Sequence, residues 1–321
     1  MKISVLGCGR WGSFLAWYCV KLGYDVMLWG RKNSDSYKNL ELNRQNSYLT
    51  LPPSIKLTNS LDEAISHGDV IIISISAQGL REFAGRLSKY NIEGKTFVLC
   101  MKGIEADTGK RLTEVFNDGI DKDVNLAIWV GPGHVQDYIN GIPNCMVIDS
   151  ADTGITKELV DIFASELIRF YYGHDLIGNE IGAASKNVIG IAAGMLDGFN
   201  LTSLKGALMA RGTREISRLI RALGGDPFTA YGLCHLGDYE ATLFSAHSHN
   251  RRFGEAYAKG EYFVKLAEGV DTTRALVNLS KEYNVDLPIC QGVYAILFDK
   301  REPEKVLNDM FLRSIKFEFW G

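Results

Sequence analysis

The sequence predicts an α/β protein, with a doubly wound parallel sheet in an N-terminal domain and an all-α C-terminal domain. Two observations predict this class. Short apolar runs rich in β-branched residues alternate with amphipathic stretches through the first half of the chain. These runs disappear after Asn179, and apolar residues then recur at helical spacing. We therefore expect a sheet domain over residues 1–173 and a helical domain over residues 174–321.

The predicted strands lie at residues 2–6, 25–29, 70–75, 96–100, 126–129 and 144–148. Their apolar residues are continuous rather than alternating, which indicates strands buried on both faces and hence a parallel sheet. A helix is expected over residues 11–22, directly after the first strand. The intervals between the later strands leave room for further helices.

Long helices are expected in the second half, at residues 182–196, 204–223 and 272–283. The segment Gly224-Gly225-Asp226-Pro227 predicts a turn between helices. No low-complexity linker marks the border near residue 173. The two domains are therefore expected to share an extensive interface, and a cleft at that interface is a natural ligand site.

Composition excludes several classes of protein. The 321 residues carry 35 Lys and Arg against 38 Asp and Glu, a net charge of -3, which argues against an electrostatic nucleic-acid binder. No apolar run approaches the ~20 residues that a membrane span needs. The six cysteines are scattered without a CxxC pair, so neither a metal cluster nor a disulfide framework is expected. A reducing cytoplasm fits this cysteine usage.

A glycine-rich segment follows the first predicted strand and opens the first predicted helix. It reads GxGxxG, with Gly7, Gly9 and Gly12 enclosing Arg10 and Trp11. In this context the first glycine permits a tight turn, the second lets a pyrophosphate approach the backbone, and the third lets helix and strand pack closely. The helix N-terminus supplies free N–H groups. The alternative is an ordinary strand–helix turn, but the alternating elements that follow favour a Rossmann-type dinucleotide-binding domain.

The end of the second predicted strand bears on the choice of cofactor. An NAD-selective site usually places an acidic residue here, and this chain has Arg31 and Lys32 instead. Arg31 is suited to stacking on adenine and pairing with a 2′-phosphate, which favours NADP. Two solvated side chains are the alternative. Asp35 lies just downstream, so NAD remains open as the cofactor.

A series of motifs in register resembles the bacterial NAD(P)-dependent glycerol-3-phosphate dehydrogenases. The resemblance runs from the first strand to about Leu297. Its motifs are GxGxWG at 7–12, LPPSI at 51–55, KGIE at 102–105, Gly131-Pro132, KNV at 186–188, Arg211-Gly212 with Glu215, Gly237-Asp238 and NRRFG at 250–254. A series of motifs in one order is far more specific than any single motif.

The resemblance implies an oxidoreductase. Hydride would pass between NAD(P)H and carbon 2 of dihydroxyacetone phosphate or glycerol 3-phosphate, a small phosphorylated substrate. The implied cellular role is the supply of glycerol phosphate for phospholipid synthesis in the cytoplasm. The sequence is compatible with a homodimer and does not fix the oligomeric state.

Three residues carry the expected chemistry, since reduction of a ketone develops negative charge on its oxygen and needs a proton donor. The resemblance assigns Lys186 as the catalytic lysine and Lys102 as a second active-site lysine, which also borders the cofactor. Asp238 is the expected carboxylate partner of Lys186. Burial and a second ammonium lower the pKa of a lysine, and a carboxylate raises it. The alternatives are solvated lysines and a turn-capping Asp, but Lys186 lies in an apolar run with few other charges.

The resemblance also assigns the remaining site residues. For the substrate these are Gly131, Gly133, Asn187, Ser248, His249 and Asn250. For the cofactor it adds Val135, His249 and Glu268 to the GxGxxG residues and Arg31, which the motif and the residue types already indicate. Asn187 packing between helices and Glu268 as a surface acid are the alternatives for those two.

Departures from the family pattern cluster around the substrate. Histidine stands at position 249 in place of the arginine of the family's SRN segment, and Gly133-His134 replaces Ser-Phe. His235 and His247 are further replacements. A histidine grips phosphate less firmly than the guanidinium fork of arginine, so the phosphate site should be weakened unless Arg251 or Arg252 compensates. Because the histidine spacing does not make a ligand set, we expect no metal site.

These departures keep two other functions open. One is a dehydrogenase with the same chemistry and a different hydroxy or keto substrate. The other is a non-catalytic NAD(P)-binding protein, against which the joint presence of Lys102, Lys186 and Asp238 argues.

Overall fold

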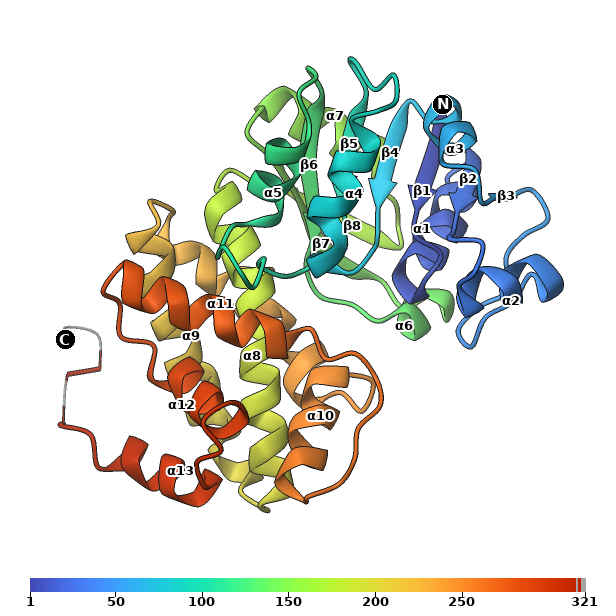
Figure 1. The fold of residues 1–321 in the computed structure, drawn as a ribbon. Coiled ribbons are helices and arrows are strands. Elements are labelled where there is room, and N and C mark those ends of the chain that lie inside the picture. The colour runs from blue at the N-terminus through green and yellow to red at the C-terminus, as the bar shows by residue number, and fades with distance from the viewer. Residues whose placement is uncertain (316, 319–321) are drawn as a thin grey trace.

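The computed structural model describes residues 1–315 and 317–318. A sheet domain packs on a helical domain, and the chain passes once from the first to the second (Figure 1). The sheet has eight strands in the order β3-β2-β1-β4-β5-β6-β7-β8. The strands are β1 Lys2–Leu6, β2 Asp25–Trp29, β3 Lys56–Thr58, β4 Val70–Ile73, β5 Thr96–Leu99, β6 Asn125–Val130, β7 Asn144–Ser150 and β8 Ile168–Tyr172.

The chain first adds β2 and β3 on one side of β1 and then adds β4 and the later strands on its other side, so the strand order reverses between β1 and β4. Such a switch point opens a crevice at the carboxyl ends of the strands, where doubly wound sheets bind ligands. All pairings are parallel except that of β6 with β7, which is antiparallel. The sequence pattern could not predict this reversal, because a strand buried on both faces has the same composition in either direction.

Two strands of the sheet escape the sequence pattern, and both lie at an edge. β3 has three residues, and β8 alternates buried with exposed side chains at its start. Edge strands of this kind lack the continuous apolar run that marks the central strands. The rest of the predicted set agrees with the structure, with ends that differ by one or two residues.

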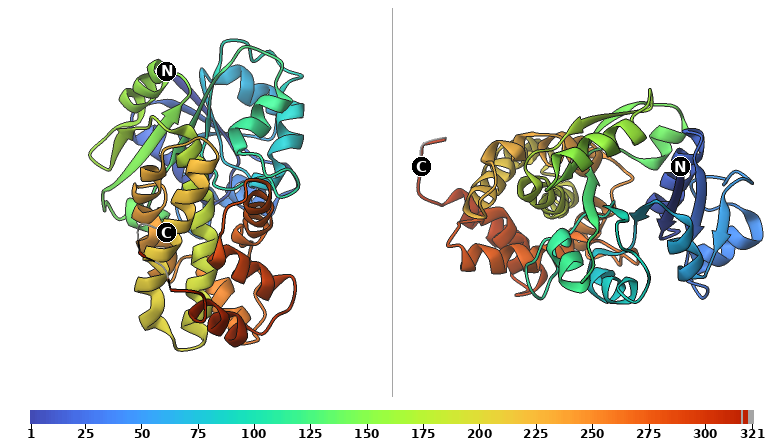
Figure 2. Two further views of the ribbon diagram at one scale, coloured as in Figure 1. Left: turned by 90° about the vertical axis from the view of Figure 1, so that its left-hand side faces the viewer. Right: turned by 90° about the horizontal axis from the view of Figure 1, so that it is seen from above.

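Helices cover both faces of the sheet. α1, α6 and α7 contribute to one hydrophobic core, and α3, α4 and α5 contribute to the core on the opposite face. Figure 2 shows the two helical layers with the sheet between them. Their bounds are α1 Arg10–Lys21, α2 Asp35–Asn43, α3 Leu61–His67, α4 Leu80–Leu87, α5 Leu112–Gly119, α6 Val135–Ile139 and α7 Thr153–Phe163.

The helical domain is built around one buried helix, α8, which runs from the sheet into the second domain (Figures 1 and 2). Among the described residues no strand follows β8. None of the helices found there is long and apolar enough to cross a membrane. The helices are α8 Leu176–Gly198, α9 Lys205–Ala222, α10 His249–Ala258, α11 Gly269–Glu282, α12 Pro288–Leu297 and α13 Pro303–Phe311.

α8 and α10 cross at very short range, which fixes the position of the candidate site. A Cβ at Gly194 would lie 1.9 Å from the Arg251 carbonyl oxygen, and a Cβ at Gly254 would lie 2.0 Å from that of Ile191. Glycine therefore permits a backbone contact that other residues would prevent. The crossing brings the start of α10 against the middle of α8, where the sequence places its candidate catalytic lysine.

The two domains are also joined by a buried carboxylate. Glu180, in the first turns of α8, accepts hydrogen bonds from the Arg111 guanidinium at 2.6 Å and from the backbone N–H and hydroxyl of Thr113 at 2.9 and 2.6 Å. These partners belong to the start of α5 in the sheet domain. The border that the sequence predicts, between residues 173 and 174, lies in the connection between β8 and α8.

Candidate active site

Two lysines from different domains meet at a single carboxylate oxygen. The Nζ atom of Lys102 lies 2.6 Å from Oδ2 of Asp238, and the Nζ atom of Lys186 lies 2.8 Å from the same oxygen. Asp238 is 1% exposed and Lys186 is 8% exposed, so the interaction is shielded from water. The predicted triad is therefore brought together, and Asp238 bridges both lysines rather than Lys186 alone.

Each member of the triad is positioned by a different kind of element. Lys102 follows the carboxyl end of β5, where a parallel sheet opens to ligands. Lys186 lies in the middle of α8, surrounded by buried residues. Asp238 ends a short 3₁₀ turn, Leu236–Asp238, that packs against α8.

The protonation of Lys186 is tuned by its surroundings. Burial lowers the pKa of the Lys186 ammonium to about 8, Asp238 opposes this shift, and the charge of Lys102 adds to it. The sequence predicts the direction of each of these contributions. A lysine with this pKa exchanges protons near neutral pH, as a general acid or base must.

Thr242 is a site residue that the sequence analysis missed. The Nζ atom of Lys186 donates a hydrogen bond to Thr242 Oγ1 at 2.7 Å, and Thr242 is 2% exposed. Thr242 lies in the π-helical turn Glu240–Phe244, four residues after Asp238. Its spacing from Asp238, which places both side chains on one side of a helical segment, is the signal that could have revealed it.

The glycine turn has the shape that a pyrophosphate needs. Gly7 has φ +122°, and a Cβ there would lie 2.1 Å from the Ser74 carbonyl oxygen, whereas a Cβ at Gly12 would lie 1.8 Å from the Gly7 carbonyl oxygen. At Gly9 a Cβ would meet nothing within 4 Å. Gly7 and Gly12 therefore make the tight turn, and Gly9 leaves open space before the N-terminus of α1. This space fits the phosphates of a dinucleotide.

The remaining cofactor candidates lie around this turn or on the opposite domain. Arg10 and Trp11 begin α1, and Val135 begins α6. Arg31 is exposed just beyond β2, and Glu268 precedes α11. Burial raises the pKa of the Glu268 carboxyl to about 7, while Lys102 and Lys186 oppose this shift. The positive charges of Lys102 and Lys186 therefore act on the Glu268 carboxyl.

The loop after β6 faces the lysine pair with its backbone. Gly131 has φ +135°, and its carbonyl oxygen accepts a hydrogen bond from Lys102 Nζ at 2.6 Å. Gly133 has φ +140°, and a Cβ there would lie 2.4 Å from the Tyr138 hydroxyl oxygen. Both positions therefore need glycine, for conformational reasons and, at Gly133, for space.

The start of α10 forms a network of amides beside Lys186. Asn250 donates from Nδ2 to Oδ1 of Asn187 at 3.0 Å, and its Oδ1 accepts the backbone N–H of Gly269 at 2.9 Å. Ser248 caps α10 by accepting the Arg251 N–H at 3.3 Å. The predicted substrate residues Asn187, Ser248 and Asn250 thus lie together and also hold three helices in register.

His235 is a core residue, contrary to its expected place beside the substrate. Its side chain is fully buried, its Nδ1 lies 2.9 Å from the Gly182 carbonyl oxygen, and its Nε2 lies 2.7 Å from the Tyr239 hydroxyl. Burial lowers the pKa of the His235 imidazole to about 4, so it is neutral at pH 7. The neutral ring donates to the carbonyl and accepts from the hydroxyl, which satisfies both nitrogens.

Arg251 is engaged by two acidic residues, whereas His249 contacts one backbone carbonyl oxygen. His249 Nδ1 lies 3.3 Å from the Leu266 carbonyl oxygen, which joins α10 to the loop before α11. Arg251 is engaged with Asp197 at 2.8 Å and Glu255 at 2.9 Å. Arg251 therefore cannot supply the guanidinium that the sequence lacks at position 249. Within the described residues no group of three or more His, Cys, Asp or Glu could hold a metal ion.

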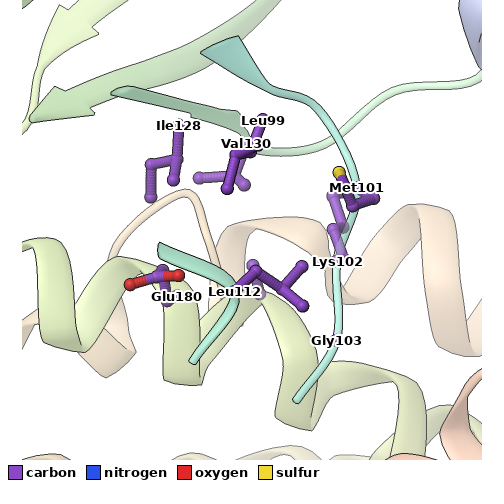
Figure 3. Close-up of a pocket in the computed structure, with 9 residues that line it drawn as sticks. Leu99, Met101, Lys102, Gly103, Leu112, Ile128, Val130 and Glu180 are labelled. Carbon is purple, nitrogen blue, oxygen red and sulfur yellow. The ribbon is translucent and has the colours of Figure 1, made fainter. Parts of the chain in front are cut away.

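Lys102 helps to line a pocket between the sheet and α8 (Figure 3). It is lined mainly by apolar side chains, and its acidic residue is Glu180, whose carboxylate is already bound by the start of α5. The pocket therefore belongs to the packing between domains. The groups that suit a reacting carbonyl lie at Asp238.

Comparison with protein families gives two matches that together span most of the chain. Residues 2–156 match the family described as NAD-dependent glycerol-3-phosphate dehydrogenase N-terminus, and residues 175–308 match the corresponding C-terminus.

Individual relatives agree with these matches. The chain is 37% identical to a glycerol-3-phosphate dehydrogenase [NAD(P)+] of Prosthecochloris aestuarii, over 99% of this chain and 100% of that protein. A protein of the same name from Fusobacterium nucleatum is 34% identical, over 99% of this chain and 98% of that protein. Among solved structures, glycerol-3-phosphate dehydrogenase from Coxiella burnetii superposes with a TM-score of 0.90 at 26% identity, covering 97% of this chain and 98% of that one.

Proposed function

Because the chain belongs to the NAD-dependent glycerol-3-phosphate dehydrogenase family, we propose that it transfers hydride between NAD(P)H and carbon 2 of dihydroxyacetone phosphate, forming glycerol 3-phosphate. The observation that carries this proposal is the convergence of Lys102 and Lys186 on one oxygen of Asp238. A protein that only binds dinucleotides needs no such arrangement.

Lys186 is the proton donor in this proposal. Gly7, Gly9 and Gly12 would hold the cofactor, which would supply the hydride when bound. As the carbonyl is reduced, its oxygen gains charge, and the Lys186 ammonium donates a proton to it. Lys102 polarises the same oxygen by its positive charge, and the buried setting strengthens this effect. In the oxidative direction, neutral Lys186 accepts the proton of the hydroxyl group.

Asp238 and Thr242 position the proton donor. The carboxylate opposes the lowering of the Lys186 pKa that burial causes, and so keeps the ammonium populated near neutral pH. The Thr242 hydroxyl accepts one of the ammonium hydrogens. A further hydrogen of the ammonium then remains for the substrate oxygen, since an ammonium has three donors.

We further propose a cofactor, a cellular compartment and an assembly for the enzyme. NADP and NAD both remain as cofactors, and Arg31 supports NADP. The six unpaired cysteines support a reducing cytoplasm. The product would serve phospholipid synthesis, and a homodimer is the proposed assembly.

A steady-state assay tests the function. The protein is mixed with dihydroxyacetone phosphate and NADPH, then with NADH, and loss of cofactor absorbance is followed. Consumption of the cofactor with formation of glycerol 3-phosphate is the expected result. Turnover confined to a non-phosphorylated ketone would replace the proposed substrate, and cofactor binding without turnover on a panel of ketones would replace the enzymatic function.

A further inference from the structure

His134 carries a buried ring nitrogen without a partner. Its Nε2 atom is inaccessible to solvent and has no hydrogen-bond partner among the described residues. The residue lies between Gly133 and the first residue of α6, at the loop that faces Lys102. A buried polar atom left unpaired is costly, so a ligand that pairs with it is favoured.

The surroundings of His134 are rich in positive charge. Burial, the charge of Arg10 and the charge of Lys186 lower the pKa of its imidazole to about 4, in that order of size. Asp137 and Asp238 oppose this shift to a smaller extent. The ring is therefore neutral at pH 7 and lies near the reacting ammonium as well as near the glycine turn. An anion placed here would find net positive charge from two domains.

Contacts within the sheet domain hold the Arg10 side chain near the loop of His134. Its guanidinium donates a hydrogen bond to Gln136 Oε1 at 2.7 Å and lies 5.0 Å from the centre of the Tyr48 ring. Its charge also contributes to lowering the pKa of His249, after the larger effect of burial. Because Gln136 is two residues after His134, this hydrogen bond brings Arg10 to the loop that carries His134, and the charge of Arg10 acts on both histidines.

We propose that His134 Nε2 and the Arg10 guanidinium together bind the phosphate group of the substrate. This inference rests on the proposed function. Only one carbon and one oxygen separate the carbonyl of dihydroxyacetone phosphate from its phosphorus. When the carbonyl lies at Lys186, the phosphate therefore lies in the surroundings of Lys186, to which His134 belongs.

On α10, Arg251 is engaged with acidic residues, whereas Arg252 is exposed to solvent, with its guanidinium 5.8 Å from the centre of the Phe263 ring. Arg10 thus supplies from the sheet domain the charge that His249 lacks. The pyrophosphate of the cofactor is the other source of the same chemistry, since Arg10 opens α1. The experiment separates these two sources.

The test compares His134→Phe, which keeps a ring and removes both nitrogens, with His134→Gln, whose amide can donate in place of Nε2. His174→Phe, at an exposed position outside the site, is the matched control. For each variant, KM for dihydroxyacetone phosphate, Kd for NADPH and the rise in Tm caused by inorganic phosphate are measured. The Tm without ligand shows that each variant is folded.

His134→Phe is expected to raise KM for dihydroxyacetone phosphate about tenfold or more, which is the scale of a hydrogen bond to a charged group. It should remove most of the phosphate-induced rise in Tm, which reports binding directly. His134→Gln should recover part of both effects, and Kd for NADPH should stay unchanged. Arg10→Gln should raise the same KM.

Other outcomes overturn the inference. A weaker affinity for NADPH with an unchanged KM for dihydroxyacetone phosphate would assign His134 to the cofactor instead. Unchanged values of all three quantities would exclude a phosphate at His134. Failure of the proposed function is distinguishable, because the wild-type protein would then not turn over dihydroxyacetone phosphate at all.

Discussion

Lys102 and Lys186 share one oxygen of Asp238, with Nζ to Oδ2 distances of 2.6 and 2.8 Å. Two neighbouring ammonium groups repel each other, and the carboxylate that both contact offsets this repulsion. The same arrangement leaves both ammoniums near a common point, where a developing alkoxide would be stabilised. The relationship ties the protonation of Lys186 to the presence of Lys102 and Asp238.

Replacement of Lys186 by alanine tests the proton donor. Lys186→Ala should lower kcat by about 10²–10⁴, the contribution expected of a positioned proton-transfer group. Kd for NADPH, measured by fluorescence titration, should be unchanged because the ammonium of Lys186 contacts Asp238 and Thr242 and not the glycine turn. Lys157→Ala, on the exposed side of α7, serves as control. Near-normal turnover of Lys186→Ala would contradict the assigned role.

The pH dependence should run in opposite directions for the two reactions. Reduction needs the Lys186 ammonium, so its kcat/KM should fall as pH rises through about 8. Oxidation needs neutral Lys186, so its kcat/KM should rise through the same pH. Asp238→Asn removes the carboxylate that raises the Lys186 pKa and should move both inflections to lower pH. Profiles that share one direction would show that another group is titrating.

Thr242 offers a test of positioning. Thr242→Val keeps the shape of the side chain and removes the oxygen that accepts the Lys186 hydrogen bond. Losing this bond disfavours the charged form, so the inflection of the reductive profile should move down by about one pH unit. Thr242→Ser should restore it. A merely structural role would lower Tm or kcat and leave the inflection in place.

The glycine turn allows cofactor binding to be separated from folding. Gly9 has an ordinary φ of -74° and open space at its Cβ position, so Gly9→Ala should fold with an unchanged Tm. The added methyl group would occupy the space that fits the pyrophosphate, and Kd for NADPH should rise about tenfold or more. Gly12→Ala, in contrast, should lower Tm, because its Cβ would lie 1.8 Å from a carbonyl oxygen. Wild-type affinity of Gly9→Ala would move the cofactor elsewhere.

The cofactor preference depends on Arg31 in our interpretation. Arg31→Ala should raise KM for NADPH about tenfold and leave KM for NADH nearly unchanged, since only NADPH carries the 2′-phosphate. Steady-state kinetics with both cofactors measure this ratio. An equal rise for both cofactors would indicate stacking on adenine instead.

Local patterns explain most of what could be predicted. The central strands β1, β2, β4 and β5 are visible in the sequence because burial on both faces demands continuous apolar residues. The glycine turn is visible because its backbone needs glycine at fixed spacing. β3 and β8 were missed because an edge strand is only partly buried.

The site was only partly visible. The resemblance between motifs indicates Lys102, Lys186 and Asp238. Thr242 carries no motif of its own, and its spacing from Asp238 is the one local signal for it. His235 was placed beside the substrate, but its ring fits between Gly182 and Tyr239 in the core. The sequence leaves Arg251 as a candidate for the missing phosphate contact, but the structure pairs it with Asp197.

The sequence by itself determined the class of fold, the dinucleotide turn and the family, since these depend on residue type and spacing along the chain. Only the tertiary structure decided which side chains meet. It places Asp238 between two lysines and pairs Arg251 with acidic residues. It also leaves one nitrogen of His134 unpaired near Arg10. The physical reason is that charge and hydrogen bonding act through space. Their outcome depends on distances between segments that no local pattern encodes.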